Sequence, residues 1–336
     1  MEKLVLSGSP HIKAPRTTKS IMIDVCVALL PATVVGIVFF GLNALITMII
    51  SVVGAFAAEL IWKMAFMRKN FRQFAAEFDF TSIVTGMLIG MNMPPLVDWY
   101  IPLIADFFAV WIVKMLFGGT GRNIVNPAIA GRVFVFLSFG IVAANGFVEP
   151  IVTGNGTFTD VVVAGSTPLG SLFMNGEFTA TNMQLFLGTV PGCIGETSAL
   201  ALIVGGLYLV VRRVIDIRWP VIYIAVTGLL TVAIKGFDFT WFLPSILSGG
   251  LMLGAIFMAT DYVTTPNTAW GNVIYFVALG VITAVLRCNN GTEVVSFAIL
   301  LMNLVVPIID KYIFPRPFGH VKQPKAKKQK AVKEGE

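Results

Sequence analysis

Long apolar runs recur along almost the whole sequence, and they restrict the fold more than any other feature. Of the 336 residues 56% are hydrophobic and only 12% are charged, whereas a soluble domain carries about 25% charged residues. A run of about 18 or more apolar residues is long enough to cross a bilayer as a helix. We therefore predict an all-α polytopic membrane protein.

The apolar runs predict about ten transmembrane helices, of which the third and fifth are short or broken. Their expected positions are 21–40, 43–62, 81–97, 100–117, 129–145, 198–211, 219–234, 242–259, 270–287 and 293–313.

Lysine and arginine are distributed unevenly over this layout. With a cytoplasmic N-terminus, 22 of the 24 cations fall on the cytoplasmic side, among them Lys114 and Arg132, and only Lys235 and Arg287 fall outside. Because cytoplasmic loops carry an excess of Lys and Arg, both termini are predicted to be cytoplasmic. The net charge of +6 is then a topological signal, and we expect no nucleic-acid partner.

A short motif occurs twice. The segments FDFTSIVTGMLIG (Phe78–Gly90) and FDFTWFLPSILSGGLMLG (Phe237–Gly254) share Phe-Asp-Phe-Thr followed by Ser-Ile-x-[Ser/Thr]-Gly-x-Leu. They fall in the third and eighth spans, which are equivalent in two halves of five, and an odd number of spans makes the halves inverted. The expected organisation is a cytoplasmic arm at 1–20, a first five-helix repeat at 21–145, an extracytoplasmic loop at 146–197, a second five-helix repeat at 198–314 and a basic cytoplasmic tail at 315–336.

Ionisable residues in or beside the spans are candidates for ion coupling, because charge is costly at membrane depth. These are Asp24, Glu59, Asp106 and Asp261. The alternative is that each lies at the end of a span, facing water or another protein of a complex. The three cysteines are far apart and form no CxxC pair, so we expect no metal site or disulfide within the chain.

Two polar motifs stay ambiguous on residue chemistry alone. The segment GGTGRNIVNP (Gly118–Pro127) is a turn that joins helices or a cradle for an anion. Its Asn123 and Asn126 have amides that both donate and accept, so they could bind the polar edge of a ring. In AGSTPL (164–169), Pro168 favours an extended Thr167, and a simple turn is the default interpretation.

Four ordered blocks carry a resemblance to a known family. They are Ser7–Ala32, Phe117–Phe134, Ser166–Gly170 and Phe257–Arg287. Across them, and along the chain to about Phe318, the sequence resembles the D subunits of Rnf complexes, which are membrane-bound ferredoxin:NAD oxidoreductases. It is more distantly similar to the B subunits of sodium-pumping NADH:quinone oxidoreductases. The fold that this resemblance implies is similar to that of urea transporters.

The resemblance also implies two flavins. FMN would be joined through its phosphate to a Thr hydroxyl, and Thr167 matches the acceptor, with Asp160 and Gly165 at matching positions. Ala164 and Ser166 differ from the usual residues. A non-covalent riboflavin on the cytoplasmic side maps to Asn123 and Asn126.

The function implied is that of one membrane subunit in a redox-driven translocase of the bacterial plasma (inner) membrane. It would carry electrons across the membrane, coupled to Na⁺ or H⁺ movement through Asp24, Asp106 and Asp261. The implied partners are the other Rnf subunits, above all the second subunit with covalent FMN, and a flavin transferase. No catalytic residue is expected in this chain alone. Two alternatives remain: a flavin-free channel or transporter for a small solute, and a structural anchor of a redox complex.

Overall fold

The computed structural model describes residues 16–144, 146–153, 157–158, 167–176, 178–290 and 294–313, and the regular elements in these ranges are helices. Most of the predicted arm, the basic tail, and Asp160 to Ser166 lie outside the described residues. The elements in chain order are α1 (Thr18–Ala65), α2 (Phe71–Glu77), α3 (Thr81–Met91), α4 (Tyr100–Phe107), η1 (Phe108–Met115), α5 (Pro127–Ala144), η2 (Ile151–Thr153), α6 (Pro168–Gly170), η3 (Ser171–Asn175), α7 (Asn182–Leu187), α8 (Ala199–Val211), α9 (Arg218–Ile234), η4 (Phe239–Trp241), α10 (Phe242–Leu247), α11 (Leu251–Leu253), η5 (Gly254–Met258), α12 (Ala269–Asn290) and α13 (Val295–Tyr312).

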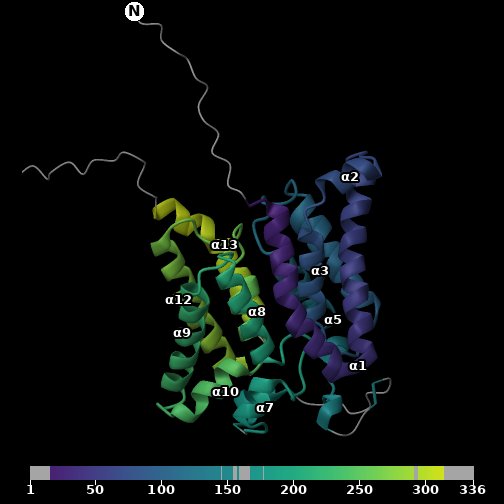
Figure 1. Cartoon of the computed structure of the whole chain (residues 1–336). Coiled ribbons are helices and arrows are strands. Elements are labelled where there is room, and N and C mark those ends of the chain that lie inside the picture. The colour runs from purple at the N-terminus through teal and green to yellow at the C-terminus, as the bar shows by residue number, and fades with distance from the viewer. Residues whose placement is uncertain are drawn as a thin grey trace, which may run out of the picture.

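The first element, α1, is a helical hairpin. Its 48 residues would extend about 72 Å as one straight helix, more than twice the bilayer core. Gly41 breaks it with a φ of 73°, a conformation that glycine adopts without steric cost. The amide of Leu42 donates to the carbonyl of Phe158 at this turn (2.9 Å). Figure 1 shows α1 descending in purple from one end of the bundle and returning to α2 at the same end.

Apolar side chains cover the outer surface of α1. Val27, Leu30, Val34 and Val38 recur every three or four residues and are between 41% and 55% exposed. A continuous apolar stripe of this kind on the outside of a bundle needs lipid or another protein to cover it.

Within the part of the chain that the structure describes, three helices, α1, α12 and α13, are each long and apolar enough to cross a membrane. Two bent pairs of helices raise this number to up to five, and shorter apolar helices lie at 127–140, 199–211 and 218–234. The length, composition and outward apolar surface of these helices make the chain a multi-pass membrane protein.

The two copies of the Phe-Asp-Phe-Thr motif lie at the two bent pairs: the first copy falls at the break between α2 and α3, and the second falls at the start of the other pair, where Asp238 caps η4. Helices α2 and α3 meet at 76°, and the stretch from η4 to α10 meets α11 and η5 at 68°. In both copies the aspartate accepts from the backbone N–H and the hydroxyl of the threonine two residues later. The distances are 3.1 and 2.6 Å for Asp79, and 2.9 and 2.7 Å for Asp238. Figure 1 shows α2 and α10 at opposite ends of the bundle.

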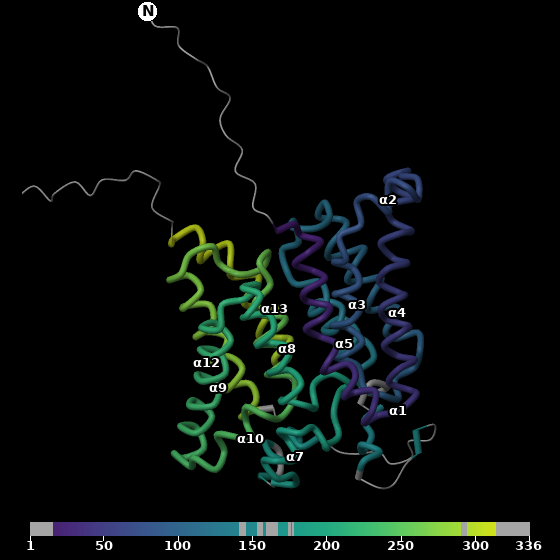
Figure 2. Tube along the Cα trace, viewed as in Figure 1, coloured from purple at the N-terminus to yellow at the C-terminus, as the bar shows by residue number. Residues whose placement is uncertain are grey.

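The helices form two side-by-side groups, α1 to α5 and α8 to α13, which Figure 2 shows in purple-blue and green-yellow. Helices α1 and α8 meet closely, because a Cβ built on Gly205 would overlap the carbonyl oxygen of Ala28. The start of α1 and the end of α13 lie at one end of the bundle, and α7 lies at the other (Figure 1). These are called the terminal end and the loop end below.

Candidate functional site: two cavities between the helix groups

A cavity of about 290 Å³ opens at the loop end, between the two helix groups. Thr167 lines it, together with apolar residues of α5 and of the segment that precedes α8. Thr167 is extended (φ −66°, ψ 139°), as the following proline predicts, and half-buried. Its Oγ1 accepts from the backbone N–H of Gly170 (3.4 Å), so Thr167 begins the short helix α6. The residue predicted to accept the flavin therefore lies on the wall of a cavity at the loop end.

An aromatic cluster holds the helix after Thr167 against the second helix group. Leu169, Leu172 and Phe173 pack with Trp241 and Cys288. Lys235 lies over this cluster, with its Nζ 4.6 Å from the ring centre of Trp241. Lys235 is one of the two cations predicted on the outer side, and its ammonium makes a cation–π contact with Trp241.

The other cation predicted outside, Arg287, is fully buried. Its Nη1 donates to the carbonyl oxygen of Ser245 (2.8 Å), near the end of α10. This guanidinium satisfies a carbonyl at a helix C-terminus, where a cation is favourable.

The loop-end cavity also contains a buried ion pair that the sequence pattern did not indicate. Arg132 of α5 pairs with Glu196 (2.6 Å), donates to the side-chain oxygen of Asn92, and lies 4.0 Å from the sulfur of Cys193. Arg132 was expected on the cytoplasmic side and Glu196 in the outer loop, yet the structure brings the two side chains together. The reason is that residues 193–195 fold into the bundle, where Ile194 and Gly195 donate to the carbonyls of Met93 and Met91.

A second, smaller cavity of about 120 Å³ opens at the terminal end, also between the two helix groups. Asn123, Asn126 and Asp261 all line it. Helix α5 begins at Pro127, so both asparagines precede the helix and do not share a helical face.

The two asparagines differ in what their amides already bind. Asn126 accepts from the backbone N–H of Ala128 (3.0 Å) and donates to the carbonyl of Met258 (3.3 Å). It therefore caps α5 and ties it to the second helix group. Asn123 donates only to the nearby carbonyl of Val125 (3.0 Å), which leaves its side-chain oxygen without a partner among the described residues.

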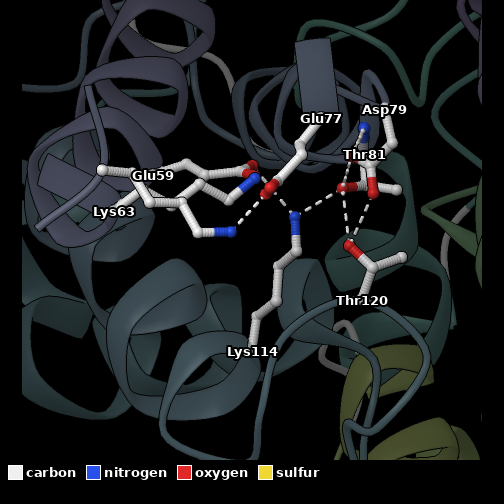
Figure 3. Close-up of polar contacts among 8 residues, drawn as sticks. Glu59, Lys63, Glu77, Asp79, Thr81, Lys114 and Thr120 are labelled. Atoms are coloured by element: carbon white, nitrogen blue, oxygen red, sulfur yellow. Dashed lines mark hydrogen bonds and ion pairs between the residues drawn. The ribbon is translucent and has the colours of Figure 1, made fainter. Parts of the chain in front are cut away.

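A polar network flanks this cavity, and Figure 3 shows how its members point toward one another. Glu59 is fully buried and pairs with Lys63 (2.6 Å) and with Lys114 (3.0 Å). Lys114 is also buried and donates to the hydroxyl of Thr81, which lines the cavity with it. The buried ammonium group of Lys114 is therefore held at the cavity wall by Glu59, whose carboxylate also forms an ion pair with Lys63.

Asp79 extends the network to the turn before α3. It accepts from the hydroxyls of Thr81 (2.6 Å) and Thr120 (2.7 Å). Burial raises the pKa of Asp79, but the charge of Lys114 and the threonine hydrogen bonds outweigh burial, so this pKa lies below its usual value. The turn from 118 to 121 needs glycine, because Gly118, Gly119 and Gly121 have φ values of 106°, 94° and 85°.

Asn92 and Met258 lie between the two cavities, and the side-chain amide of Asn92 donates to the carbonyl oxygen of Leu88 (2.6 Å), which lines the terminal-end cavity. The side-chain amide of Asn92, which lines the loop-end cavity, lies 3.9 Å from the sulfur of Met258. The amide of Asn126, which lines the other cavity, donates to the carbonyl of the same Met258. Met258 therefore contacts one residue of each cavity wall.

The three carboxylates predicted for ion coupling lie apart from one another. Asp24 is paired with Arg212 (3.2 Å) and accepts from Tyr208 (3.1 Å). Asp261 accepts from Thr264 (3.2 Å) beside the terminal-end cavity. Asp106 is fully buried inside the first helix group and lies 3.1 Å from the hydroxyl of Ser51.

The fold and the two cavities define a class: a multi-pass helical membrane protein with a cavity at each end of the interface between two helix groups. Its family follows from comparison with known proteins. The model of the NQR2, RnfD, RnfE family matches residues 5–319, and the chain belongs to this family.

Relatives of similar length are named as D subunits of redox complexes. That of the Na(+)-translocating ferredoxin:NAD(+) oxidoreductase complex of Acetobacterium woodii is 39% identical over 325 residues, which cover 95% of this chain and 96% of the relative. That of the proton-translocating ferredoxin:NAD(+) oxidoreductase complex of Clostridium ljungdahlii is 36% identical, with 94% and 96% covered. That of the ion-translocating oxidoreductase complex of Halorhodospira halophila is 33% identical, with 94% and 96% covered.

Proposed function

We propose that this chain is the D subunit of an ion-translocating ferredoxin:NAD oxidoreductase complex in a bacterial plasma membrane, and that it carries electrons across that membrane. The observation that carries the proposal is the pair of cavities at opposite ends of one interface, with Thr167 in one and Asn123 in the other. Family membership and the names of the relatives support the same assignment. The terminal end is then cytoplasmic and the loop end extracytoplasmic.

Covalent FMN on Thr167 is the first part of the proposal. The Thr167 hydroxyl lies on the wall of a cavity that is largely apolar and holds a buried guanidinium, Arg132. Its volume of about 290 Å³ is just below the range of roughly 300–1,000 Å³ for ligand pockets. A flavin supplies electron transfer when it is bound. Here Thr167 would anchor the phosphate, the apolar walls would exclude water, and Arg132 would face the ring with its charge balanced by Glu196.

Non-covalent riboflavin at the terminal end is the second part. The side-chain oxygen of Asn123 and the ammonium of Lys114 offer an acceptor and a donor to the polar edge of a ring. The cavity there, at about 120 Å³, is smaller than a typical ligand pocket. Its side chains must therefore move apart to admit the ring. Electrons would then pass between the two sites by way of Met258.

The arrangement of the helices supports two inverted five-helix repeats in ten spans. The same Asp–Thr turn precedes α3 and begins η4, and α2 and α10 lie at opposite ends of the bundle (Figure 1). Asp24, Asp106 and Asp261 remain the candidates for coupling electron transfer to Na⁺ or H⁺. A second subunit with covalent FMN and a flavin transferase are the partners that the proposal requires.

The experiment is to express the chain with a flavin transferase and to look for ultraviolet fluorescence of the denatured protein on a gel. Wild type should fluoresce and Thr167→Ala should not. Thr181→Ala is the matched control, since Thr181 is also a helix-capping threonine of this segment. A dark wild type would favour a flavin-free channel or an anchor, and a fluorescent Thr167→Ala would exclude Thr167 as the acceptor.

A further inference from the structure

Asp106 lies on α4, in the interior of the first helix group, against α1 and α3. Its side chain and that of Ser51 on α1 are both fully buried. Ser51 Oγ lies 3.1 Å from Asp106 Oδ1 and 2.8 Å from the carbonyl oxygen of Gly86 on α3. Both contacts are within hydrogen-bonding distance, so the serine hydroxyl bridges the carboxyl group and the carbonyl.

The number of protons available in this bridge bears on the state of the carboxyl group. A serine hydroxyl has one proton to donate, and a backbone carbonyl can only accept. The contact to Gly86 is the shorter of the two, and we assign the proton of Ser51 to it. The contact between Ser51 and Asp106 is then a hydrogen bond only if the carboxyl group donates, which requires a proton on Asp106 Oδ1.

The surroundings of the other carboxyl oxygen also favour a protonated Asp106. Asp106 Oδ2 is buried and has no hydrogen-bond partner among the described residues. It lies against the backbone of Gly54, where an added Cβ would come within 2.7 Å of it. A buried carboxylate with one donor and no cation is strongly unfavourable, whereas a neutral acid loses much less on burial.

The charges on the packed helices do not neutralise Asp106. On α1 the nearest acid along the helix is Glu59, which pairs with Lys63 and Lys114, and Lys114 is the cation of η1. Helix α3 contains no titratable residue, and the one cation of α5, Arg132, pairs with Glu196.

We propose that Asp106 is a proton-binding site, a neutral carboxylic acid that donates a hydrogen bond to Ser51 in the interior of the first helix group. The bound ligand is a proton and not a metal ion. Loss of this proton would require the Ser51 hydroxyl to turn from Gly86 to the new carboxylate. A role of Asp106 in ion coupling rests on the proposed function, whereas the protonation of Asp106 does not.

The test is infrared spectroscopy of the purified chain at neutral pH, in buffers with Na⁺ or with K⁺. The wild type should show the carbonyl-stretch band of a protonated carboxyl group, and the band should shift in D₂O. Asp106→Asn should lack this band, while Ser51→Ala should move it toward the frequency of a free carboxyl group. Glu59→Gln is the matched control, because Glu59 is equally buried but paired with two ammonium groups, and it should keep the band.

Three results would overturn the proposal: no such band in the wild type, a band that survives in Asp106→Asn, or a band that Na⁺ abolishes. Spectra of the wild type alone show whether the band is present and whether Na⁺ abolishes it. Since the readout requires neither flavin nor electron transfer, a negative result in the gel experiment on Thr167 leaves this proposal standing, and the reverse also holds.

Discussion

The buried network around Glu59 predicts that substitution of Glu59 and substitution of Lys114 lower the stability of the protein by different amounts. Glu59 pairs with Lys63 and Lys114, and the side chains of Glu59 and Lys114 are 0% and 3% exposed. In Lys114→Met the hydrogen bonds to Glu59 and Thr81 are both lost, but Glu59 keeps Lys63 as its partner and Thr81 still donates to Asp79, so no buried charge is left unpaired and the expected loss is about 1.5–3 kcal/mol. In Glu59→Gln, Lys114 stays buried without its carboxylate, and the expected loss is about 3–5 kcal/mol.

The double variant Glu59→Gln/Lys114→Met separates pairing from packing. It removes both buried charges and leaves Lys63, which is 11% exposed and can reach water. Its stability should therefore exceed that of Glu59→Gln alone, because replacement of a whole buried ion pair is often close to neutral.

The assay is unfolding of the purified chain in mixed micelles, followed by tryptophan fluorescence. Trp111 donates to the carbonyl of Ala58 (2.9 Å), beside Glu59, so it reports on this region. Lys69→Met is the matched control, since Lys69 makes an ion pair with Glu77 at the exposed surface, where such pairs contribute little. The reasoning is refuted if Lys114→Met costs no more than Lys69→Met, or if Glu59→Gln is the milder of the two buried changes.

Three further predictions concern the helix interface, the pH response and the path between the cavities. Gly205→Ala should lower the thermal midpoint, because its Cβ would overlap the Ala28 carbonyl and the helices must separate; an unchanged midpoint would contradict the close α1–α8 contact. The pKa of Asp79 is lower in the folded chain than its usual value of 3.8. Ionised Asp79 therefore stabilises the folded chain at pH values above 3.8, and this stabilisation is lost as the pH falls below 3.8. Unfolding measured against pH should show this acid-sensitive component in the wild type and not in Asp79→Asn. Met258→Ala should slow electron exchange between the two flavins in stopped-flow absorbance, and an equal rate would exclude Met258 from the path.

The sequence predicted well those features that depend on local pattern. Apolar runs predicted an all-helical membrane protein, and the gap between the first two predicted runs, 21–40 and 43–62, contains Gly41, where α1 turns back. Pro168 predicted the extended backbone of Thr167. Each of these follows from the properties of a residue and its immediate neighbours.

Ion pairs between residues far apart in the sequence could not be predicted from the sequence pattern. Arg132 and Glu196 are 64 residues apart and meet only because the segment before α8 folds into the bundle. Lys114 was counted on the cytoplasmic side, yet it is buried against Glu59 of another helix. An ionisable residue inside an apolar run was the available signal for both cations, but its partner is a property of the tertiary fold.

The most direct test of the account is peptide mapping by mass spectrometry on the intact complex from its native membrane. The account predicts that the peptide containing Thr167 carries the mass of FMN less one water, with fragmentation placing the phosphoester on the Thr167 oxygen. A Thr167 peptide that is found only unmodified, in a complex that transfers electrons from ferredoxin to NAD, would contradict it.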